Sequence, residues 1–450
     1  MTVASLPDSL RQRAVQAGHH RYQLLRSTYT TIASPEVILL PETSDEAVEA
    51  LNYARDSGLP VSVRSGGHSL SGRSSNHGGI VLDLSALNAV DVLDADERVV
   101  RIGAGARWAN VTHALAPHGW AISSGDHGNV GVGGLATAGG IGWFARSSGL
   151  TIDHVRAVDV LLADGTRVRA DRTAEPDLYW AMRGAGDSVG IALGFEIEAT
   201  AAHDVGVAQM VVAADRAGDV LRRWSEYTSA APRELSTAAI LMPYQGGVVM
   251  QITAVVASAD QPVIRRLVQP LTKIGRTLDD VVQLVPYTAL MSKHHLHANV
   301  GQQPVTVTNG LLPTLASDSA RAIMDVAAHP SGPIVQLRSL GGAINDVATD
   351  ATAYAHRHQQ TLAIVSQFPP GDGAQLDDAW RSVEPYADGA YRSFESRPNS
   401  HTFRLAFPGP TGDRVLDLRN RFDPEGVLRR LAIDQAVTDV NPTDALEESR

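Results

Sequence analysis

The sequence contains no cysteine. This absence excludes disulfide bonds, thiolate nucleophiles and zinc sites built from thiolates. Aromatic residues are also scarce, at 5% of the chain, and no apolar run is long enough to span a membrane. The N-terminal region has no apolar segment of the kind that directs secretion. We therefore expect a cytoplasmic protein that has no disulfide bonds and no membrane partner.

An excess of positive charge is lacking as well, because the 450 residues carry a formal net charge of −11. An acidic surface does not attract nucleic acid or anionic membranes, so neither is expected as a partner. Hydrophobic residues at 44% and charged residues at 19% describe an ordinary globular protein, long enough for two domains. We expect a small-molecule ligand, and either a monomer or a homo-oligomer.

Glycine, by contrast, is abundant and gathers in three loops. The first loop follows the β-branched run Val61-Ser62-Val63, where Gly66 and Gly67 precede His68. Adjacent glycines permit positive φ angles, and successive N–H groups can cradle an anion while a flat partner approaches the backbone. A turn with an incidental histidine is the alternative interpretation of this short segment taken alone.

The other two glycine loops favour a cofactor site. They span residues 125–143 and 184–190. The first of these opens a helix-like segment, whose N-terminal N–H groups and dipole suit a diphosphate. Its segment Gly131-Val132-Gly133-Gly134 is not the GxGxxG fingerprint, so NAD binding is not expected. Three such loops at strand ends indicate a large cofactor lying along bare backbone.

These loops resemble a known family. The segment Arg64-Ser65-Gly66-Gly67-His68-Ser69, the long glycine loop and residues 177–184 resemble the FAD domain (PCMH type) of the vanillyl-alcohol-oxidase superfamily. More narrowly, they are similar to the berberine-bridge-enzyme-like flavoproteins, which include bacterial alkaloid and sugar oxidases. The resemblance extends over residues 34–200, is weak in the middle of the chain, and returns at residues 419–431 with Phe422-Asp423-Pro424.

The resemblance implies FAD joined covalently through its 8α-methyl group to His68. Many relatives add a second bond from a cysteine, and in this chain His127 falls at that position, so one covalent link is the most that it can form. The residues expected to bind the cofactor are Arg64, Ser65, Gly66, Gly67, His68, Ser69, Gly125, Asp126, His127, Val130, Gly131, Gly133, Gly134, Gly139, Gly140, Gly142, Gly190 and Ile191.

The first part of the chain predicts a strand, a helix and a second strand leading to His68. Thr43 and Glu46 form a capping-box pattern, and apolar residues recur at helical spacing up to Gly58. The dipeptide Asp164-Gly165 between two apolar runs predicts a β-hairpin. Residues 1–33 are expected to form a polar helix and an irregular lead-in. The first strand of the strand-helix-strand unit is expected at residues 37–40. Further strands are expected at residues 79–84, 99–103 and 190–199, and further helices at 108–115 and 176–182.

The middle of the chain predicts an antiparallel sheet backed by helices. Strands are expected at residues 205–214, 236–242, 248–258, 278–285 and 334–340, and helices at 217–230, 261–274 and 316–328. The fold class is therefore α+β. We expect an FAD-binding domain over residues 1–200, a substrate-binding domain over 201–400, and a C-terminal segment, 401–450, that returns to the FAD-binding domain.

A flavin oxidises an alcohol or an amine by accepting hydride at N5, and attachment to an imidazole is expected to raise its reduction potential. Arg64 or the loop N–H groups are candidates to stabilise negative charge on the reduced ring. In the related proteins, the residue at the position of Val130 controls access of oxygen, and valine is permissive. Oxidase activity is therefore favoured over dehydrogenase activity. The alternative is that Val130 is simply packed.

The catalytic residues are less defined. Many relatives place a carboxylate on a strand facing the flavin, but the corresponding stretch here has Gln336 and Arg338 on that face. Arg338 cannot act as a base, yet it can bind a carboxylate or phenolate. Tyr391 is the first candidate for deprotonating a substrate hydroxyl, and Tyr287 is the second. All of them have an alternative interpretation as ordinary residues lining a cleft.

Two further segments carry weaker signals. Lys293-His294-His295-Leu296-His297 places two imidazoles one helical turn apart, but no HExxH pattern or carboxylate accompanies them, so no metal site is expected. Relatives follow the Asp-Pro motif with asparagines, whereas residues 430–434 contain none.

The sequence thus predicts an FAD-dependent enzyme that oxidises a hydroxyl- or amine-bearing small metabolite, with O2 as acceptor and H2O2 as product, in secondary metabolism. The alternatives are an FAD-linked dehydrogenase, an oxidative cyclase, or a flavin-binding protein without turnover.

Overall fold

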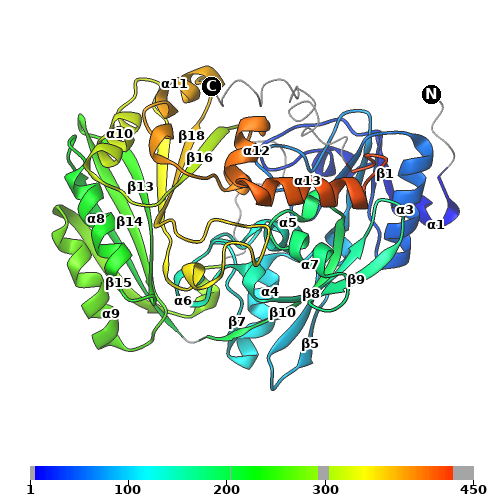
Figure 1. Cartoon of the computed structure of the whole chain (residues 1–450), viewed down its shortest axis with the longest axis horizontal. Coiled ribbons are helices and arrows are strands. Elements are labelled where there is room, and N and C mark those ends of the chain that lie inside the picture. The colour runs from blue at the N-terminus through cyan, green and yellow to red at the C-terminus, as the bar shows by residue number, and fades with distance from the viewer. Residues whose placement is uncertain (1–5, 203, 292–303, 429–450) are drawn as a thin grey trace.

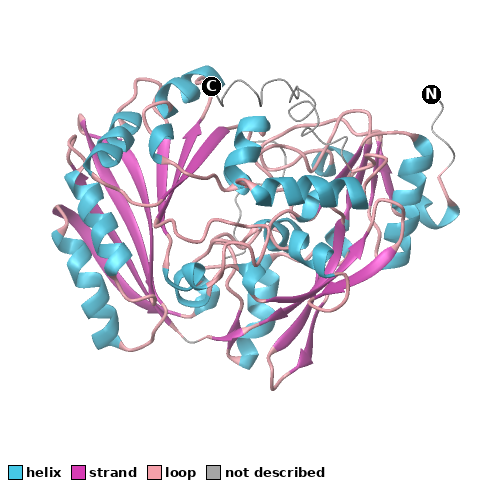
Figure 2. Ribbon diagram, in the orientation of Figure 1, coloured by secondary structure: helices cyan, strands magenta, loops and turns pink. Residues whose placement is uncertain are grey.

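The computed structural model describes residues 6–202, 204–291 and 304–428. Three main sheets and the helices that cover them form two regions that lie side by side (Figures 1 and 2). The α+β class predicted from the sequence is confirmed. None of the described helices combines the length and the apolar character that crossing a bilayer requires.

A four-stranded sheet delivers the His68 loop. Its strands lie in the order β1 (Ala14–Gln16), β2 (Val37–Leu39), β4 (Ile80–Asp83), β3 (Val61–Arg64). Strands β2, β4 and β3 are parallel, and helix α3 (Ser44–Ser57) connects β2 to β3. The Thr43 side chain accepts a hydrogen bond from the Glu46 N–H, and Gly58 ends the helix with φ of 64°. The predicted strand-helix-strand unit is therefore present, with β4 between its two strands.

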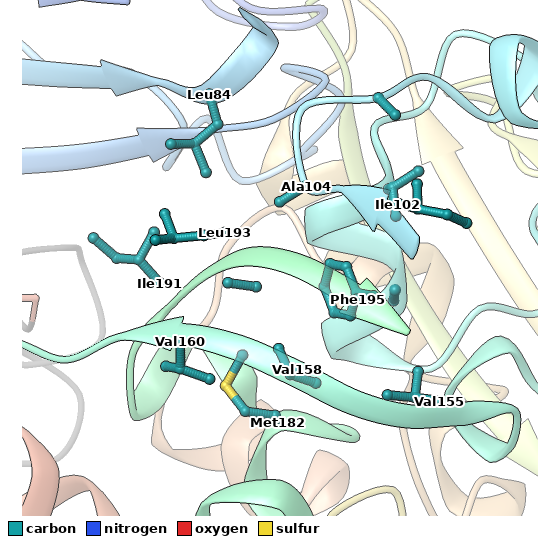
Figure 3. Packing of buried hydrophobic residues seen from close by; sticks show 14 of the residues in the cluster. Leu84, Ile102, Ala104, Val155, Val158, Val160, Met182, Ile191, Leu193 and Phe195 are labelled. Atoms are coloured by element: carbon teal, nitrogen blue, oxygen red, sulfur yellow. The ribbon is translucent and has the colours of Figure 1, made fainter. Parts of the chain in front are cut away.

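An antiparallel five-stranded sheet carries the third glycine loop. Its order is β5 (Val90–Asp94), β6 (Val99–Gly103), β10 (Ile191–Glu198), β8 (Val155–Leu161), β9 (Arg167–Asp171). Strands β8 and β9 form the hairpin predicted at Asp164-Gly165. Buried side chains of β6, β8 and β10 pack together with Met182 and Leu84 (Figure 3). This core fixes the start of β10, where the glycine loop ends.

The largest sheet has seven antiparallel strands. Their order is β15 (Arg276–Val285), β12 (Val205–Ala214), β14 (Gly247–Val256), β13 (Leu235–Tyr244), β17 (Ile334–Ser339), β18 (Thr361–Gln367), β16 (Thr306–Leu312). Helices α8 (Asp219–Ala230), α9 (Gln261–Val268), α10 (Ser317–Ala327) and α11 (Gly373–Trp380) cover one face (Figure 1). The sequence predicted this sheet but not β16 and β18, because both strands are buried along nearly their whole length and lack an alternating pattern.

Smaller elements complete the chain. They are the helices α1 (Asp8–Arg11), α2 (Tyr22–Leu25), α4 (Trp108–Leu115), α5 (Val132–Ala138), α6 (Ala145–Ser148), α7 (Pro176–Met182), α12 (Ser400–Ala406) and α13 (Pro410–Phe422), and the strands β7 (Trp120–Ala121) and β11 (Thr200–Ala201).

Helix α13 packs against α7 across more than 200 positions of sequence (Figure 1). Arg414 and Arg421 both contact the Asp177 carboxylate, at 2.9 and 3.1 Å. Beyond the helix, the buried carboxylate of Asp423 accepts hydrogen bonds from the backbone N–H groups of Val427 and Leu428. The C-terminal segment therefore lies on the first region. The domain boundaries at residues 200 and 400 stay predictions.

Two predicted elements differ from the structure. Residues 14–16 form strand β1 instead of helix, because Val15 is buried and pairs with Ile38. The helix predicted over residues 261–274 ends at Val268 and continues as a 3-10 turn over Gln269–Lys273. Pro270 explains this change, because proline has no N–H to donate to an α-helical hydrogen bond.

Candidate functional site

The glycine loops converge on one cavity of about 390 Å³. Loop residues after β3, the second glycine loop, the start of β10 and the segment around Tyr391 form its walls. The sequence-predicted residues that line it are Ser65, Gly66, Gly67, His68, Ser69, Gly125, Asp126, His127, Val130, Gly131, Gly133, Gly134, Gly190, Ile191 and Tyr391. Segments separated by more than 300 positions thus contribute to a single site.

The imidazole of His68 lies between two other rings in this cavity. It stacks on Tyr29, with 4.9 Å between ring centroids and 11° between planes. The His127 ring lies 5.4 Å away on a tilted plane. Burial lowers the pKa of His127, and its Nδ1 accepts a hydrogen bond from the Asn129 N–H. The neutral His127 ring therefore carries its proton on Nε2. Sequence reasoning did not identify Tyr29.

Two glycine loops cross in direct backbone contact beside His68. A Cβ atom on Gly66 would lie 2.2 Å from the Gly131 nitrogen, and one on Gly131 would lie 2.2 Å from the Gly66 nitrogen. Arg107 Nη1 donates to the Gly66 carbonyl at 2.6 Å and also to the Asn129 carbonyl, so it ties the two loops together. These glycines are required by the contact between loops, in addition to any contact with a ligand.

Arg64 forms a buried ion pair outside the cavity. Its Nε donates to the Asp83 carboxylate at 2.8 Å, and its Nη1 donates to the Ser27 carbonyl at 3.1 Å. Both charged side chains of the ion pair are only 4% exposed. Arg64 does not line the cavity. The role of Arg64 in stabilising a reduced cofactor stays a prediction, and the ion pair with Asp83 does not favour it.

The start of α5, where a diphosphate site is predicted, has two of its N–H groups bonded to protein. The Val132 N–H donates to the Ala106 carbonyl and the Gly133 N–H donates to the Ala104 carbonyl, both at 2.9 Å. The N–H groups of these two residues are therefore already satisfied by protein backbone.

Three further glycines pack against protein and do not line the cavity. The nearest atom to a Cβ on Gly139 would be a Tyr391 ring carbon at 2.9 Å. A Cβ on Gly140 would lie 2.0 Å from the Thr151 hydroxyl, and one on Gly142 would lie 1.4 Å from the Ser124 carbonyl. The contact of Gly139, Gly140 and Gly142 with the cofactor therefore stays a prediction, and the close packing around each of them explains why a side chain does not fit there.

Tyr391 lines the cavity, but its hydroxyl group is engaged. The Gly140 N–H donates to the Tyr391 oxygen at 2.9 Å, and the Tyr391 N–H donates to Asn309 Oδ1 at 2.7 Å. Burial raises the pKa of Tyr391, although the hydrogen bonds from Ser393 and Gly140 oppose that shift. A phenol must lose its proton before it can act as a base, so this environment disfavours the role proposed for Tyr391.

Two other catalytic candidates lie outside the cavity. Tyr287 is buried and stacks on Phe144 with 4.4 Å between centroids, and burial raises its pKa to about 12. Gln336 lies on β17 without reaching the cavity wall. Neither residue lines the cavity, so their catalytic roles stay predictions without support from its geometry.

Arg338 does not line the cavity either, but it holds a residue that does. Its Nη1 lies 2.6 Å from the carboxylate of Asp126, and its guanidinium lies 5.3 Å from the Phe394 ring centroid. Asp126 and Phe394 both face the cavity. A carboxylate in this position can accept a proton from a hydroxyl group or bind an ammonium group.

Asp187, Arg73 and Arg392 form an ion-pair cluster at the cavity wall that the sequence did not predict. Asp187 accepts a hydrogen bond from Arg73 Nη1 at 2.6 Å and another from Arg392 Nη2. Burial opposes ionisation of Asp187, but the two guanidinium groups outweigh it and lower the pKa to about 2. The three residues come from separate segments, 114 and 205 positions apart. No local pattern signals such a cluster.

Replacing Asp187 by asparagine is expected to lower the free energy of unfolding at pH 7 by about 1 kcal/mol, a value reduced for solvent screening because Asp187 is 36% exposed. The pKa in the folded protein, about 2, lies below the ordinary 3.8, so the stabilisation is complete at neutral pH and is lost as the pH falls through this interval. Urea unfolding of both proteins should show a difference that is constant down to about pH 5 and about halved at pH 3. A constant difference throughout would contradict the assignment.

Among the described residues, no group of three His, Asp or Glu side chains is arranged to hold a metal ion. The histidine-rich segment 293–297 and the tail residues 430–434 lie outside the described residues.

A family model for an FAD-binding domain matches residues 35–171, which contain the His68 loop and the second glycine loop. This chain is an FAD-linked oxidoreductase. Bare glycine backbone around a ligand-facing imidazole fits a large flat cofactor of this kind.

Relatives of the oxidoreductase support this assignment. An uncharacterised FAD-linked oxidoreductase of Bacillus subtilis is 24% identical over 88% of this chain and 90% of its own length. The (R)-6-hydroxynicotine oxidase of Paenarthrobacter nicotinovorans is 35% identical over 36% of each chain.

The fold of the oxidoreductase is shared with solved structures. The glucooligosaccharide oxidase of Acremonium strictum, which is described with a 6-S-cysteinyl, 8α-N1-histidyl FAD, has a TM-score of 0.82 at 22% identity over 92% of this chain and 95% of its own. At this identity the likeness concerns the fold alone.

Proposed function

We propose that this oxidoreductase is an oxidase whose FAD is bonded through the 8α-methyl group to His68. The substrate would be a small molecule with a hydroxyl or amine group, and O2 would accept the electrons to give H2O2. The single observation that carries the proposal is the His68 imidazole inside the cavity, beside the crossing of two glycine loops. Bound FAD would supply the hydride acceptor.

One covalent bond is proposed, because the chain has no cysteine. His127 lies beside His68, at 5.4 Å between ring centroids. In the Acremonium enzyme a cysteine and a histidine both bond to FAD. His127 would therefore pack beside the cofactor where a second bond is possible elsewhere in the superfamily.

Other residues around the cavity would orient His68, bind the substrate and exclude water. Tyr29 stacks on His68 and would restrict the orientation of its ring. Arg338 holds Asp126 at the wall, where the carboxylate would bind the reacting hydroxyl or amine group and receive its proton. Phe394, beneath the Arg338 guanidinium, would exclude water from this part of the cavity.

Two measurements test the proposed function. The intact mass of the denatured protein should exceed that of the polypeptide by the mass of FAD less two hydrogen atoms, which are lost when the C8α–N bond forms. The added mass should map to the peptide containing His68. Anaerobic mixing with alcohols, sugars and cyclic amines should bleach the flavin absorbance, and admission of air should restore it with formation of H2O2. Bleaching with slow recovery in air would favour a dehydrogenase, and a flavin that no substrate bleaches would favour a protein without turnover.

Replacement of Val130 by leucine is expected to slow reoxidation by O2 at least ~10-fold, equivalent to about 1.4 kcal/mol in the barrier. Val130 lines the cavity, and a longer side chain there would occupy space that O2 must enter. Stopped-flow mixing of the reduced variant with air-saturated buffer measures this rate. The rate of anaerobic bleaching should change little, and Val130→Ala serves as the matched control. Equal reoxidation rates for the leucine variant and the parent would contradict a role of Val130 in oxygen access.

A further inference from the structure

The seven-stranded sheet ends at a long, uncovered strand. Strand β15 pairs with β12 on one side, and no described residue pairs with its other side (left of Figure 1). An edge strand presents a row of unpaired N–H and C=O groups, which can pair with another chain. The opposite edge differs, because β16 is almost entirely buried and forms a bridge between Leu311 and Gly389.

Strand β15 also exposes an unusual set of apolar side chains. Leu278, Val281, Val282 and Leu284 are 41–45% exposed. Neighbouring residues of a strand point to opposite faces, so apolar groups project on both sides of this edge. Single exposed apolar residues are ordinary, but four of them on one strand indicate a contact surface. Strand β5, the edge of the five-stranded sheet, is only five residues long.

We propose that β15 pairs antiparallel with β15 of a second copy of this chain, around a two-fold axis that passes through Val281. Such a contact is closed, because the same patch is used on both subunits. It would join the two seven-stranded sheets into one continuous sheet. The backbone N–H and C=O groups at the β15 edge of each subunit would then be paired.

The charges of the strand exclude two neighbouring registers. With Val281 opposite the partner's Val281, Asp279 lies opposite the partner's Gln283, and Asp280 lies opposite the partner's Val282. A register centred on Asp280 would place that carboxylate opposite the partner's Asp280, and like charges directly opposite each other destabilise a sheet. A register centred on Asp279 has the same fault.

An irregularity in β15 limits the length of this contact. The pairing with β12 shifts between Val211 and Val212, so Leu278 is an extra residue without a partner. Such a bulge bends the strand and ends regular pairing. The proposed ladder therefore runs from Asp279 to Gln283, with Leu278 and Leu284 packing at its two ends.

The mass of the protein in solution tests the contact. Light scattering behind gel filtration should give a dimer for the parent and a monomer for Val281→Lys, because two lysines would face each other at the axis. Leu24→Lys, which changes a residue 46% exposed on α2, is the matched control and should remain a dimer. A monomeric parent protein would overturn the proposal. A dimeric Val281→Lys variant would overturn it as well.

The absence of cysteine permits a second test that identifies the register. Opposite residues in an antiparallel pair have Cα atoms about 4.5–5.5 Å apart, within the range that a disulfide bridges. Val281→Cys should therefore form a covalent dimer under mild oxidation. Gln283→Cys lies on the same strand but roughly 13 Å from its copy in this register, and should not. Equal cross-linking of the two variants, or none in Val281→Cys, would overturn the register.

Discussion

In the His68→Ala variant, all bound FAD is expected to leave the protein when it is denatured. The imidazole is the proposed attachment point, and the chain has no cysteine to replace it. Among the described residues, the other imidazole that lines the cavity is His127. Its ring lies 5.4 Å from the His68 ring and would not reach the same atom of the cofactor without movement of its loop. Acid precipitation measures the outcome, because covalently bound flavin stays in the pellet and free flavin stays in solution.

His127→Ala is the matched control for this experiment, since it removes a neighbouring imidazole from the same cavity. Its pellet should stay yellow. A yellow pellet from His68→Ala would show that another side chain carries the bond. A colourless pellet from the parent protein, with FAD in the supernatant, would refute the covalent link and leave the FAD-binding fold unaffected.

The second large effect is expected for Gly66→Ala. The new methyl group would lie 2.2 Å from the nitrogen and 2.7 Å from the Cα of Gly131, and both are backbone atoms. Arg107 binds the carbonyls of Gly66 and Asn129, so the two loops cannot separate without breaking these hydrogen bonds. We expect a loss of more than ~3 kcal/mol in the free energy of unfolding, because overpacking against backbone has no rotamer through which it can relax.

Urea unfolding and the FAD content of the purified protein measure this loss. Gly247→Ala is the control, because its Cβ would have only an ordinary contact, at 3.7 Å from the Tyr244 carbonyl. Gly131→Ala should lower the free energy of unfolding by as much as Gly66→Ala does. The double variant should lose less than the sum of the two single losses, because both substitutions disrupt the same contact between the loops. An unchanged free energy of unfolding in Gly66→Ala would show that the loops containing Gly66 and Gly131 are not held in close contact.

Much of the fold followed from local patterns. The N-cap at Thr43 specifies the start of helix α3, and the turn at Asp164-Gly165 specifies the β8–β9 hairpin, both without long-range contacts. The structure has both elements. The β-branched run before Gly66 placed the His68 loop at a strand end. Strands β16 and β18 were missed, because residues buried on both faces lose the alternation that identifies a strand.

Charged side chains were harder to place than the loops. The sequence put Arg64 in the site because it belongs to the segment that resembles the FAD domain, but the structure directs its guanidinium to Asp83. It omitted Arg73 and Arg392, which meet at Asp187 on the cavity wall. A long side chain can point to either face of its strand or loop, and adjacency along the chain does not specify which.

The sequence alone therefore determined the glycine loops, the position of His68 among them and the absence of any cysteine for a second bond, because backbone freedom and residue identity are local properties. Only the tertiary structure decided which groups face the cavity. Tyr391 came to the wall with its hydroxyl held by Gly140, and Asp126 was fixed there by Arg338 from a distant strand. Such contacts arise when sheets and loops pack, so they depend on partners that no local pattern specifies.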